Sequence, residues 1–596
     1  MNHMCRRATA CLLLAVLVPA WAIASPLLIK GATIFDGSGR AAYVADVEID
    51  EGRIVSVGPD LPAGKGIRVV RAHGMALLPG LFDLHTHWTP NFEPGTLPQI
   101  ANAYLAQGVT TVNDFHQAPE AYAPRRDWLA AIDAPSVRFA ARISTPLGHG
   151  ADWADENTTR WVNSPAAARA AVDAVAPYKP DLIKAFTDGW RYNNAPDNSS
   201  MDAPTLTALV EQAHIHGLRV YTHTVTLARG KIAARAGVDV IAHSLLDAPV
   251  DDELVQLMRA HGTFYAPTLA VYEPVKPGTA PARPADDPVL RQRQANFANA
   301  LANVATLHRA GVPIAVGTDA GMPGTPHGIA TQHELELLVR AGLTPAEALQ
   351  AGTSASARAA GLDDRGVIAP GKRADLILVA GQPWQDIADI HRIRRVYVAG
   401  RQVVGPGTPV PAGNRQQALP PVAVDAHVDD FERADGRTGL DTLPTDEADG
   451  GTDRTVQVSE VVARSDGGHA LSTQARLSWN PDAHAGVLLP LTRGAVAPAD
   501  LRRFHGLRFQ VRGDAPALAV QLRGLDNRRW QAPVPLNAGW NTVEVPFGQF
   551  QGQPPYGRTD GPVPAWRGDD VQQLFFDASG RPGQKLWFEL DNVEFY

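Results

Sequence analysis

The spacing of apolar positions changes at several points along the chain. Residues 27–70 alternate short apolar stretches with turn residues, which is typical of short antiparallel strands. From residue 81 to about 361, short β-rich runs alternate with longer segments of helical period. The runs that predict strands are 81–87, 109–115, 137–145, 181–187, 219–224, 238–243, 263–268 and 314–319. Helices are expected between them, among others over 166–174, 203–216 and 290–310. Eight such repeats predict a (β/α)8 TIM-like barrel.

The segments on either side of this pattern are predicted to form β-structure. Residues 362–404 return to strands and turns, so we expect them to join residues 27–78 in one discontinuous small β-sandwich domain beside the barrel at 79–361. Pro and Gly are frequent in residues 405–428, which predicts a linker. Residues 429–596 read as strands and turns and predict a C-terminal all-β jelly-roll sandwich. The fold class is therefore α/β with additional β domains.

The composition is that of a globular protein, and the N-terminal segment differs from the rest because a basic pair precedes an apolar run. The 596 residues include 54 basic and 62 acidic side chains, a formal net charge of −8 without a long run of one sign, so nucleic-acid binding is not predicted. Arg6 and Arg7 precede an apolar run, which predicts a secretory signal peptide over residues 1–24. This run is shorter than the roughly 20 apolar residues of a membrane span and contains Pro19, so no stable membrane insertion is expected after cleavage.

Both cysteines of the chain, Cys5 and Cys11, lie in that N-terminal segment. The mature protein would then contain no thiol, which suits a periplasmic or secreted protein without disulfides. Any metal that it binds must be held by histidine, carboxylate or lysine-derived ligands.

Candidate metal ligands lie at the ends of the predicted barrel strands. His85 and His87 end the first strand, and since alternate strand residues point to the same side, both imidazoles can bind one ion. With 19 histidines in 596 residues, however, a chance His-x-His pair is common. A second pair, His214 and His216, ends a helical stretch, where residues two apart face away from each other. We interpret that second pair as structural.

Further side chains of the ligand type end other barrel strands, and their presence favours a metal site over a chance pairing of His85 and His87. They are Lys184, His223, His243 and Asp319. In barrels of this kind the carboxyl ends of the strands carry the active site. All these donors are nitrogen or oxygen atoms, which suit zinc foremost, with manganese, iron, cobalt or nickel as alternatives.

Several motifs, in this order along the chain, resemble those of the amidohydrolase superfamily. They are Phe82-Asp83-Leu84-His85-Thr86-His87, Gly108-Val109-Thr110-Thr111-Val112, Asp181-Leu182-Ile183-Lys184, Thr222-His223, Gly237-Val238-Asp239-Val240-Ile241-Ala242-His243, Gly317-Thr318-Asp319 and Gly371-Lys372-Arg373-Ala374-Asp375-Leu376. More narrowly, the chain resembles the imidazolonepropionase-related branch, which includes secreted Xaa-Pro dipeptidases and other carboxypeptidase-like enzymes. The resemblance extends over about residues 27–404.

The resemblance implies a binuclear metal centre. The ligands that it implies are His85, His87 and Asp319 for one divalent ion, His223 and His243 for the second, and Lys184 between both as a lysine carbamate formed with carbon dioxide. Alternatively, Lys184 remains an ammonium in an ordinary ion pair and the site holds one metal. The ions would lower the pKa of a bound water and polarise the scissile carbonyl, and Asp319 would carry a proton from that water to the leaving amine.

Loops that follow the strands supply candidate substrate-binding residues. Those selected for the pocket are Arg191, Tyr192, Tyr265 and His327. Arg191 would bind a substrate carboxylate, although an arginine in solvent is the alternative. His149, within Leu147-Gly148-His149-Gly150, resembles a Gly-His-Gly segment of related enzymes. It would act in catalysis by polarising the carbonyl oxygen, or it would stabilise its own loop.

Residues 504–513 and 590–595 resemble the complex I intermediate-associated protein family, through weaker motifs than those of the barrel. This resemblance implies a galactose-binding-like sandwich over residues 429–596. Trp479, Trp530 and Trp566 would either stack on a sugar or, as we prefer, pack in the core of that sandwich.

We therefore expect a periplasmic or secreted binuclear metallohydrolase. It would cleave an amide or peptide bond of a small substrate, as a dipeptidase, a carboxypeptidase-like enzyme or an N-acyl amino acid hydrolase. The same metal site would also serve a lactonase or a phosphoesterase, because the activated water does not dictate the electrophile. The non-enzymatic alternative is a glycan-binding scaffold. The presence of all six predicted metal-site residues argues against it. Glycan, or a second copy of the chain, is the expected partner of the C-terminal domain.

Overall fold

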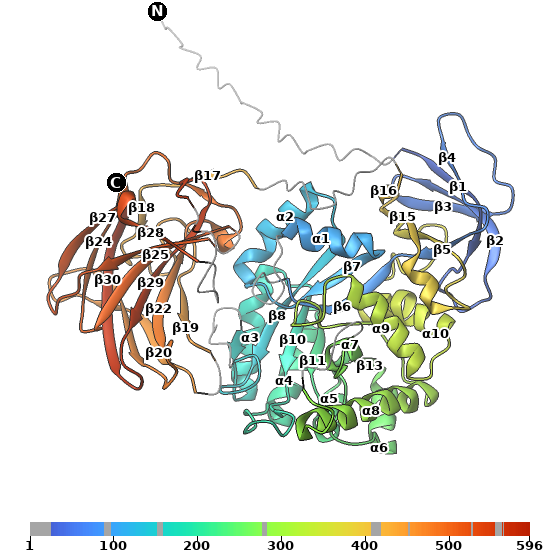
Figure 1. The fold of residues 1–596 in the computed structure, drawn as a ribbon, viewed down its shortest axis with the longest axis horizontal. Helices are drawn as coiled ribbons and strands as arrows, with labels where there is room; N and C mark the ends of the chain where they lie inside the picture. The colour runs from blue at the N-terminus through green and yellow to red at the C-terminus, as the bar shows by residue number, and fades with distance from the viewer. Residues whose placement is uncertain are drawn as a thin grey trace, which may run out of the picture.

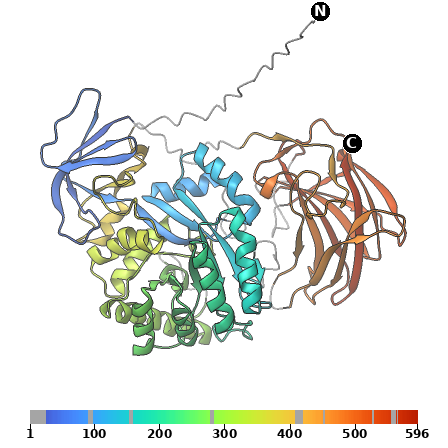
Figure 2. The same cartoon turned by 180° about the vertical axis from the view of Figure 1, so that it is seen from behind.

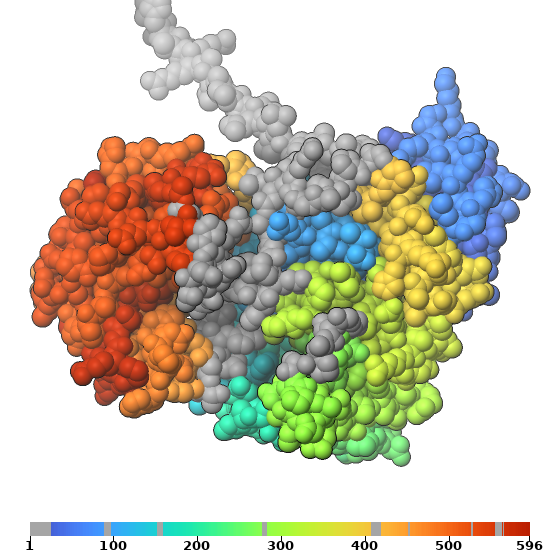
Figure 3. Space-filling view, in the orientation of Figure 1, coloured from blue at the N-terminus to red at the C-terminus, as the bar shows by residue number. Residues whose placement is uncertain are grey.

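The computed structural model describes residues 25–88, 97–151, 159–276, 283–406, 419–450, 453–525, 528–554, 563 and 565–596. It confirms the predicted fold class, since a helix-covered barrel lies between a small β-sheet on one side and an all-β sandwich on the other (Figures 1 and 3). The predicted signal peptide lies outside the described residues, as do residues 407–418 of the predicted linker. Among the helices of the described ranges, none has the length and apolar character needed to cross a membrane.

A parallel sheet forms the barrel at the centre of the molecule. Its strands follow the order β13-β12-β11-β10-β8-β7-β6, and β9 is added beside β8. Their bounds are β6 (Leu81–Thr86), β7 (Val109–Asp114), β8 (Ser136–Ser144), β9 (Thr159–Trp161), β10 (Leu182–Phe186), β11 (Arg219–His223), β12 (Val240–Ala242) and β13 (Phe264–Ala266). Every residue of β6, β7 and β10 is buried, as expected for parallel strands that are covered on both faces.

Residues 313–320 close the barrel between β13 and β6. The parallel bridges that close it are Tyr265–Ile314 and Thr86–Ala320. We predicted a regular eighth strand at 314–319, but the structure has isolated bridges there. The chain has a bridge at Ile314, no regular ladder over 315–319 and a second bridge at Ala320, and φ is 62° at Asp319.

Helices cover the outside of the barrel (Figures 1 and 2). Their bounds are α1 (Leu97–Ala106), α2 (Tyr122–Ala131), α3 (Pro165–Val175), α4 (Ala203–Ile215), α5 (Leu227–Arg235), α6 (Asp252–His261), α7 (Leu269–Tyr272), α8 (Pro288–Arg309), α9 (Ile329–Arg340), α10 (Pro345–Gln350) and α11 (Ser356–Ala359). At the end of α4, the His214 and His216 imidazoles pair with surface carboxylates at 2.9 and 2.7 Å. This placement agrees with the structural interpretation of that pair.

A second sheet flanks the barrel and contains strands from both ends of the first 404 residues. Its order is β16-β15-β14-β5-β1-β2-β3, and β4 pairs with β1. The bounds are β1 (Leu27–Ile34), β2 (Tyr43–Asp50), β3 (Arg53–Gly58), β4 (Arg68–Arg71), β5 (Met75–Pro79), β14 (Leu376–Ala380), β15 (Ile393–Val398) and β16 (Arg401–Val404). Antiparallel pairing of β5 with β14 joins the two chain segments. Because only Gly80 separates β5 from β6, this sheet also anchors the first barrel strand.

Two sheets packed face to face form the C-terminal sandwich. One follows the order β17-β23-β29-β25-β26-β28 with β19 and β22 alongside, and the other follows β20-β21-β30-β24-β27 with β18 on β30. The bounds are β17 (Val422–Ala423), β18 (His427–Asp429), β19 (Thr445–Ala448), β20 (Val456–Ala463), β21 (His469–Arg476), β22 (His484–Pro490), β23 (Ala499–Asp500), β24 (Gly506–Gly513), β25 (Ala517–Gly524), β26 (Arg529–Val534), β27 (Asn541–Pro546), β28 (Gln551–Gln553), β29 (Val571–Ser579) and β30 (Lys585–Phe595). The Phe509 and Phe576 rings meet edge to face across the core, 5.0 Å between centroids.

The three tryptophans of interest in this sandwich differ in their environment. Trp530 is buried and packs edge to face on Trp566, with 5.4 Å between the ring centroids, as core packing requires. Trp479 is 71% exposed. Core packing was the wrong prediction for Trp479, because this residue lies in the connection between β21 and β22, outside the space between the sheets.

Candidate metal centre and pocket

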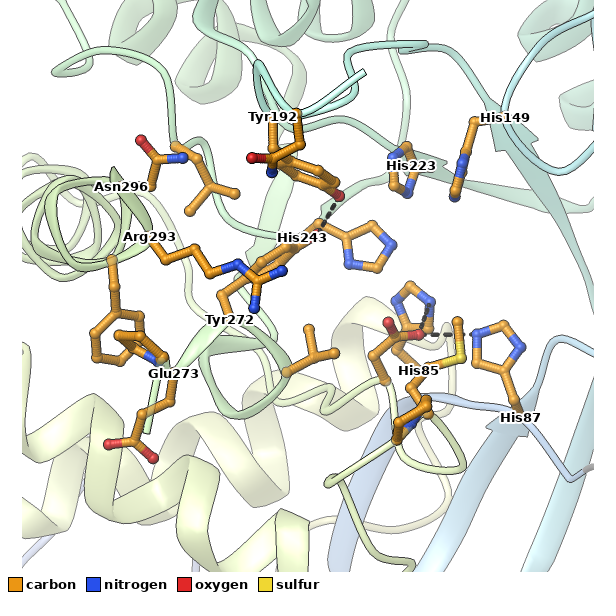
Figure 4. Close-up of a pocket in the computed structure, with 18 of the residues that line it drawn as sticks. His85, His87, His149, Tyr192, His223, His243, Tyr272, Glu273, Arg293 and Asn296 are labelled. Carbon is orange, nitrogen blue, oxygen red and sulfur yellow. Dashed lines mark hydrogen bonds and ion pairs between the residues drawn. The ribbon is translucent and has the colours of Figure 1, made fainter. Parts of the chain in front are cut away.

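The strand ends bring all six predicted metal ligands to one pocket of about 430 Å³ (Figure 4). The residues are His85 in β6, His87 after it, Lys184 in β10, His223 at the end of β11, His243 after β12, and Asp319 in the closing segment. All are buried. The convergence follows from the parallel sheet, since strands that run in one direction present their carboxyl ends at one rim.

His85, His87 and Asp319 form the tightest group of donors. Asp319 Oδ1 lies 2.8 Å from His87 Nε2 and 3.2 Å from His85 Nε2. The three donor atoms all lie within 4.8 Å of one another. Two imidazole nitrogens and a carboxylate oxygen are a donor set that fits a divalent transition metal, zinc above all.

Lys184 lies inside the barrel without a carboxylate partner among the described residues. Its Nζ is 3.3 Å from His85 Nε2 and 4.8 Å from the centre of the Phe115 ring. Burial lowers the pKa of Lys184 to about 7, although the charge of Asp319 opposes this effect. These surroundings disfavour the ordinary ion pair that we considered as the alternative for Lys184.

His223 and His243 face each other beside this group. Their ring centroids are 4.5 Å apart, and those of His243 and His85 are 4.4 Å apart. Burial holds the pKa of both His223 and His243 well below the usual range, so the imidazoles are neutral, which is the form that binds metals. His243 Nδ1 lies 3.0 Å from the Thr268 hydroxyl, which leaves Nε2 for a metal.

Strained backbone conformations gather around the same pocket. Residues other than glycine rarely adopt positive φ, and such strain persists where the surrounding structure enforces it. The positions at this end of the barrel are Leu147 (φ 59°), Tyr192 (φ 58°), His243 (φ 75°), Thr268 (φ 47°) and Asp319 (φ 62°). Two of them are predicted ligands, so the fold holds these side chains in conformations that packing alone would not select.

The Asp83 carboxylate holds the backbone beside two of the predicted ligands. Its carboxylate accepts hydrogen bonds from the backbone N–H groups of His85 (3.3 Å) and Thr318 (3.1 Å). The hydroxyls of Thr318 and Thr331 donate to Asp83 Oδ2 at 2.7 and 2.8 Å. Asp83 thus fixes the backbone next to His85 and next to Asp319 at the same time.

His149 and Tyr192 also line this pocket. The His149 and His223 ring centroids are 4.1 Å apart, and the Ser144 hydroxyl donates to the His149 carbonyl at 2.6 Å. The Tyr192 and Tyr272 hydroxyls are 3.4 Å apart. Both predicted residues therefore lie where a substrate would contact them.

The other three predicted substrate-binding residues do not line this pocket. Tyr265 is fully buried, and its hydroxyl accepts the Leu245 N–H at 2.9 Å. His327 Nδ1 lies 2.9 Å from the Tyr104 hydroxyl. Arg191 Nη1 donates to the Asn198 side chain at 3.4 Å. The structure thus places these three side chains outside the residues that line the pocket, and their role in substrate binding stays a prediction.

One face of α8 contributes residues that the sequence did not single out. Arg293, Asn296 and Phe297 line the pocket, spaced as neighbours on one side of a helix. The Arg293 guanidinium reaches toward the centre of the pocket (Figure 4) and forms no hydrogen bond or ion pair with any described residue. Its neighbour Glu273, in contrast, pairs with His333 at 2.7 Å.

The sequence matches one family of known proteins over more than half of its length. The Amidohydrolase family model matches residues 76–403. An imidazolonepropionase from Deinococcus deserti is 45% identical over 98 residues, which are 16% of this chain and 24% of that protein. The match thus spans about a quarter of the length of this relative.

Two solved structures resemble the barrel and its flanking sheet. A Xaa-Pro dipeptidase with methionine bound in its active site has 25% sequence identity and a TM-score of 0.56, over 64% of this chain and 100% of that one. A prolidase candidate from Bifidobacterium longum has 27% identity and a TM-score of 0.57, over 66% of this chain and 97% of that one.

Proposed function

Because the chain belongs to the amidohydrolase family, we propose that it is a metal-dependent hydrolase that cleaves a carbon–nitrogen bond in a small substrate bearing a carboxylate. The observation that carries this proposal is the convergence of His85, His87 and Asp319 with further nitrogen donors in one buried pocket. The similarity to an imidazolonepropionase and to a Xaa-Pro dipeptidase supports the same class of reaction. We also propose a periplasmic or secreted location, which rests on residues 1–24.

Two divalent ions, zinc first, fit the donor set. The residues that would hold them are His85, His87 and Asp319 for one ion, and His223 and His243 for the other, with Lys184 between. When bound, the ions supply Lewis acidity, which lowers the pKa of a coordinated water toward about 7 and polarises a carbonyl.

Lys184 would bridge the ions as a carbamate. Its buried amine has a pKa lowered to about 7, so a large neutral fraction exists at neutral pH. The neutral Nζ adds to the carbon of carbon dioxide and releases one proton, which gives an anionic carboxylate with two oxygen donors. Burial disfavours the ammonium form more than the charge of Asp319 favours it, which supports a neutral amine at this position.

Asp319 and His149 are assigned the remaining steps. Asp319 Oδ1 faces the His85 and His87 imidazoles, so Oδ2 is the atom that would take a proton from the attacking water and deliver it to the leaving nitrogen. His149, whose ring is tilted by 31° against that of His223, would donate a hydrogen bond to the substrate carbonyl oxygen.

Arg293 supports a substrate with a carboxylate. It is the pocket cation that lacks a partner among the described residues, whereas Lys276 donates to the carbonyl oxygens of Ala270 and Val271. A guanidinium binds a carboxylate through two parallel hydrogen bonds. Apolar side chains such as Phe297 complete the wall, so an acyl or aminoacyl group fits beside the charge.

A rate screen of the purified protein tests this proposal. The substrates are dipeptides, N-acyl amino acids, lactones and phosphotriesters, and each N-acyl amino acid is paired with its carboxamide as a matched control. We expect turnover of the amides, with kcat/KM reduced about tenfold or more for the carboxamides because the charge-assisted pair is lost. Fastest turnover of a lactone or a phosphotriester would overturn the assignment in favour of those alternatives.

A further inference from the structure

The C-terminal sandwich contacts the barrel at the loops after β7 and β8, and the second of these loops carries the pocket residue His149. It lies beside α2 and α3, which follow β7 and β8 (Figures 1 and 2). The loop after β8 contains His149, and β9, the strand that follows this loop, pairs with the end of β8. The sandwich is therefore in a position to act on the pocket through these segments.

At the loop after β7, the contact is ionic and closely packed. The buried carboxylate of Glu120 accepts two hydrogen bonds from the Arg437 guanidinium, at 2.8 and 3.2 Å, and lies 3.4 Å from Arg493. Gly494 lies directly against this loop, since a Cβ atom there would be 2.5 Å from Ala121 Cα. This contact fixes the sandwich on the barrel without touching the predicted ligands.

At the loop after β8, a buried arginine of the sandwich contacts the described part of the loop. Arg454 donates a hydrogen bond to the carbonyl of Ala151, and its guanidinium lies 5.0 Å from the centre of the Trp161 ring in β9. Arg454 is 8% exposed. Ala151 is two residues from His149 along the chain, so this hydrogen bond ends on the segment that carries the imidazole.

The barrel itself holds this segment from the other side. The Ser144 hydroxyl donates to the His149 carbonyl, and the Ala151 N–H donates to Gly148 at 3.1 Å. The segment also contains Leu147 at φ 59°, a conformation that residues other than glycine rarely adopt. The Arg454 hydrogen bond to Ala151 adds a contact from outside the barrel at the C-terminal end of this segment.

We propose that Arg454 is a positioning residue, which holds residues 145–151 so that His149 stays beside His223 in the pocket. The C-terminal sandwich is on this account a structural part of the active site rather than a separate binding module. The inference rests on the proposed function of His149. It does not depend on which metal is bound, because the contact involves only side chains and backbone of this chain.

Hydrogen exchange of the full-length protein tests the positioning directly. Arg454→Met removes the donors and keeps an apolar chain against Trp161, Arg454→Lys keeps one cationic donor, and Arg437→Met is the matched control at the other contact. We expect Arg454→Met to speed exchange in residues 145–151 about tenfold, because one buried charged hydrogen bond is lost. Arg454→Lys should restore most of the protection, and Arg437→Met should leave residues 145–151 unchanged. Unchanged exchange in Arg454→Met would overturn the proposal.

A double-mutant cycle then connects the loop to turnover. Arg454→Met should lower kcat more than it raises KM, and it should have little further effect in the His149→Ala background. If exchange rises but His149→Ala itself keeps full activity, the role of His149 under the proposed function fails while the positioning stands. If His149→Ala is impaired and Arg454→Met adds its full effect to it, the positioning is wrong. Should Arg454→Met not fold, Trp161→Leu removes the ring beneath the guanidinium and must give the same loop exchange, or the proposal fails.

Discussion

Replacing Asp319 by asparagine separates the proposed proton transfer from metal binding and folding. Asparagine has nearly the same shape and keeps one oxygen for the ion, but it cannot accept the proton of the attacking water. Asp319 has a φ of 62°, and asparagine is among the residues that adopt this conformation most readily. The backbone at the end of the barrel should therefore remain as it is.

The expected loss follows from the role of the carboxylate in the reaction. A positioned proton acceptor contributes about 100- to 10,000-fold in rate, which corresponds to about 3–5 kcal/mol of barrier. The hydrogen-bonding geometry toward His85 and His87 is retained by the amide oxygen, so binding of substrate should change little. We expect kcat to fall by about 100-fold or more while KM stays within about threefold.

The assay combines steady-state kinetics, metal analysis and thermal unfolding. Asp188→Asn is the control, because Asp188 is a buried carboxylate that is not among the six predicted metal ligands and accepts hydrogen bonds from the Thr226 N–H and hydroxyl at 2.9 and 2.7 Å. The control should lose about 1–3 kcal/mol of unfolding free energy while retaining turnover. Activity within tenfold of wild type in Asp319→Asn, with metal and fold retained, would refute the proton-transfer role.

Three further predictions concern the pocket wall, a buried acid and the domain contact. Arg293→Met should raise KM about 10- to 100-fold for substrates with a carboxylate and leave the matched carboxamides unaffected, and an equal effect on both would exclude carboxylate binding. Burial raises the pKa of Glu334 to about 8, so its ionisation is opposed in the folded state, and stability should fall as pH rises from about 4.5 to 8. The free energy of unfolding, measured with urea at several pH values, should fall less steeply with pH in Glu334→Gln than in wild type. An equal dependence on pH in both proteins would contradict the raised pKa of Glu334. Gly494→Ala should weaken the contact between sandwich and barrel, since φ is 63° and the new Cβ would lie 2.5 Å from Ala121 Cα. Limited proteolysis should then cleave faster between the two domains, and a cleavage rate equal to that of wild type would count against this contact.

The convergence of the predicted metal ligands could be foreseen from sequence because strand geometry is simple. Side chains two apart share a face, and parallel strands end at one rim, so His85, His87 and the other strand-end donors had to converge once the barrel was inferred. The eighth strand was the exception, since residues 315–319 form no regular ladder and the predicted ligand Asp319 has a positive φ.

The substrate pocket could not be predicted in the same way. Choosing Arg293 rather than Arg191 requires knowing loop conformations and which face of α8 turns inward, and neither is set by local periodicity. Tyr265 and His327 have the right chemistry but find partners within the fold. The contact of Arg454 with the His149 loop depends on how two separately folded bodies pack together, for which the sequence has no local signal.

Metal stoichiometry measured together with activity tests the central claim most directly. The protein, purified without chelator and with bicarbonate present, should contain two divalent ions per chain, lose activity on chelation and regain it when zinc is returned. Lys184→Ala should reduce the content to one ion or none and abolish turnover. Full activity in protein that retains no metal after chelation would contradict the account.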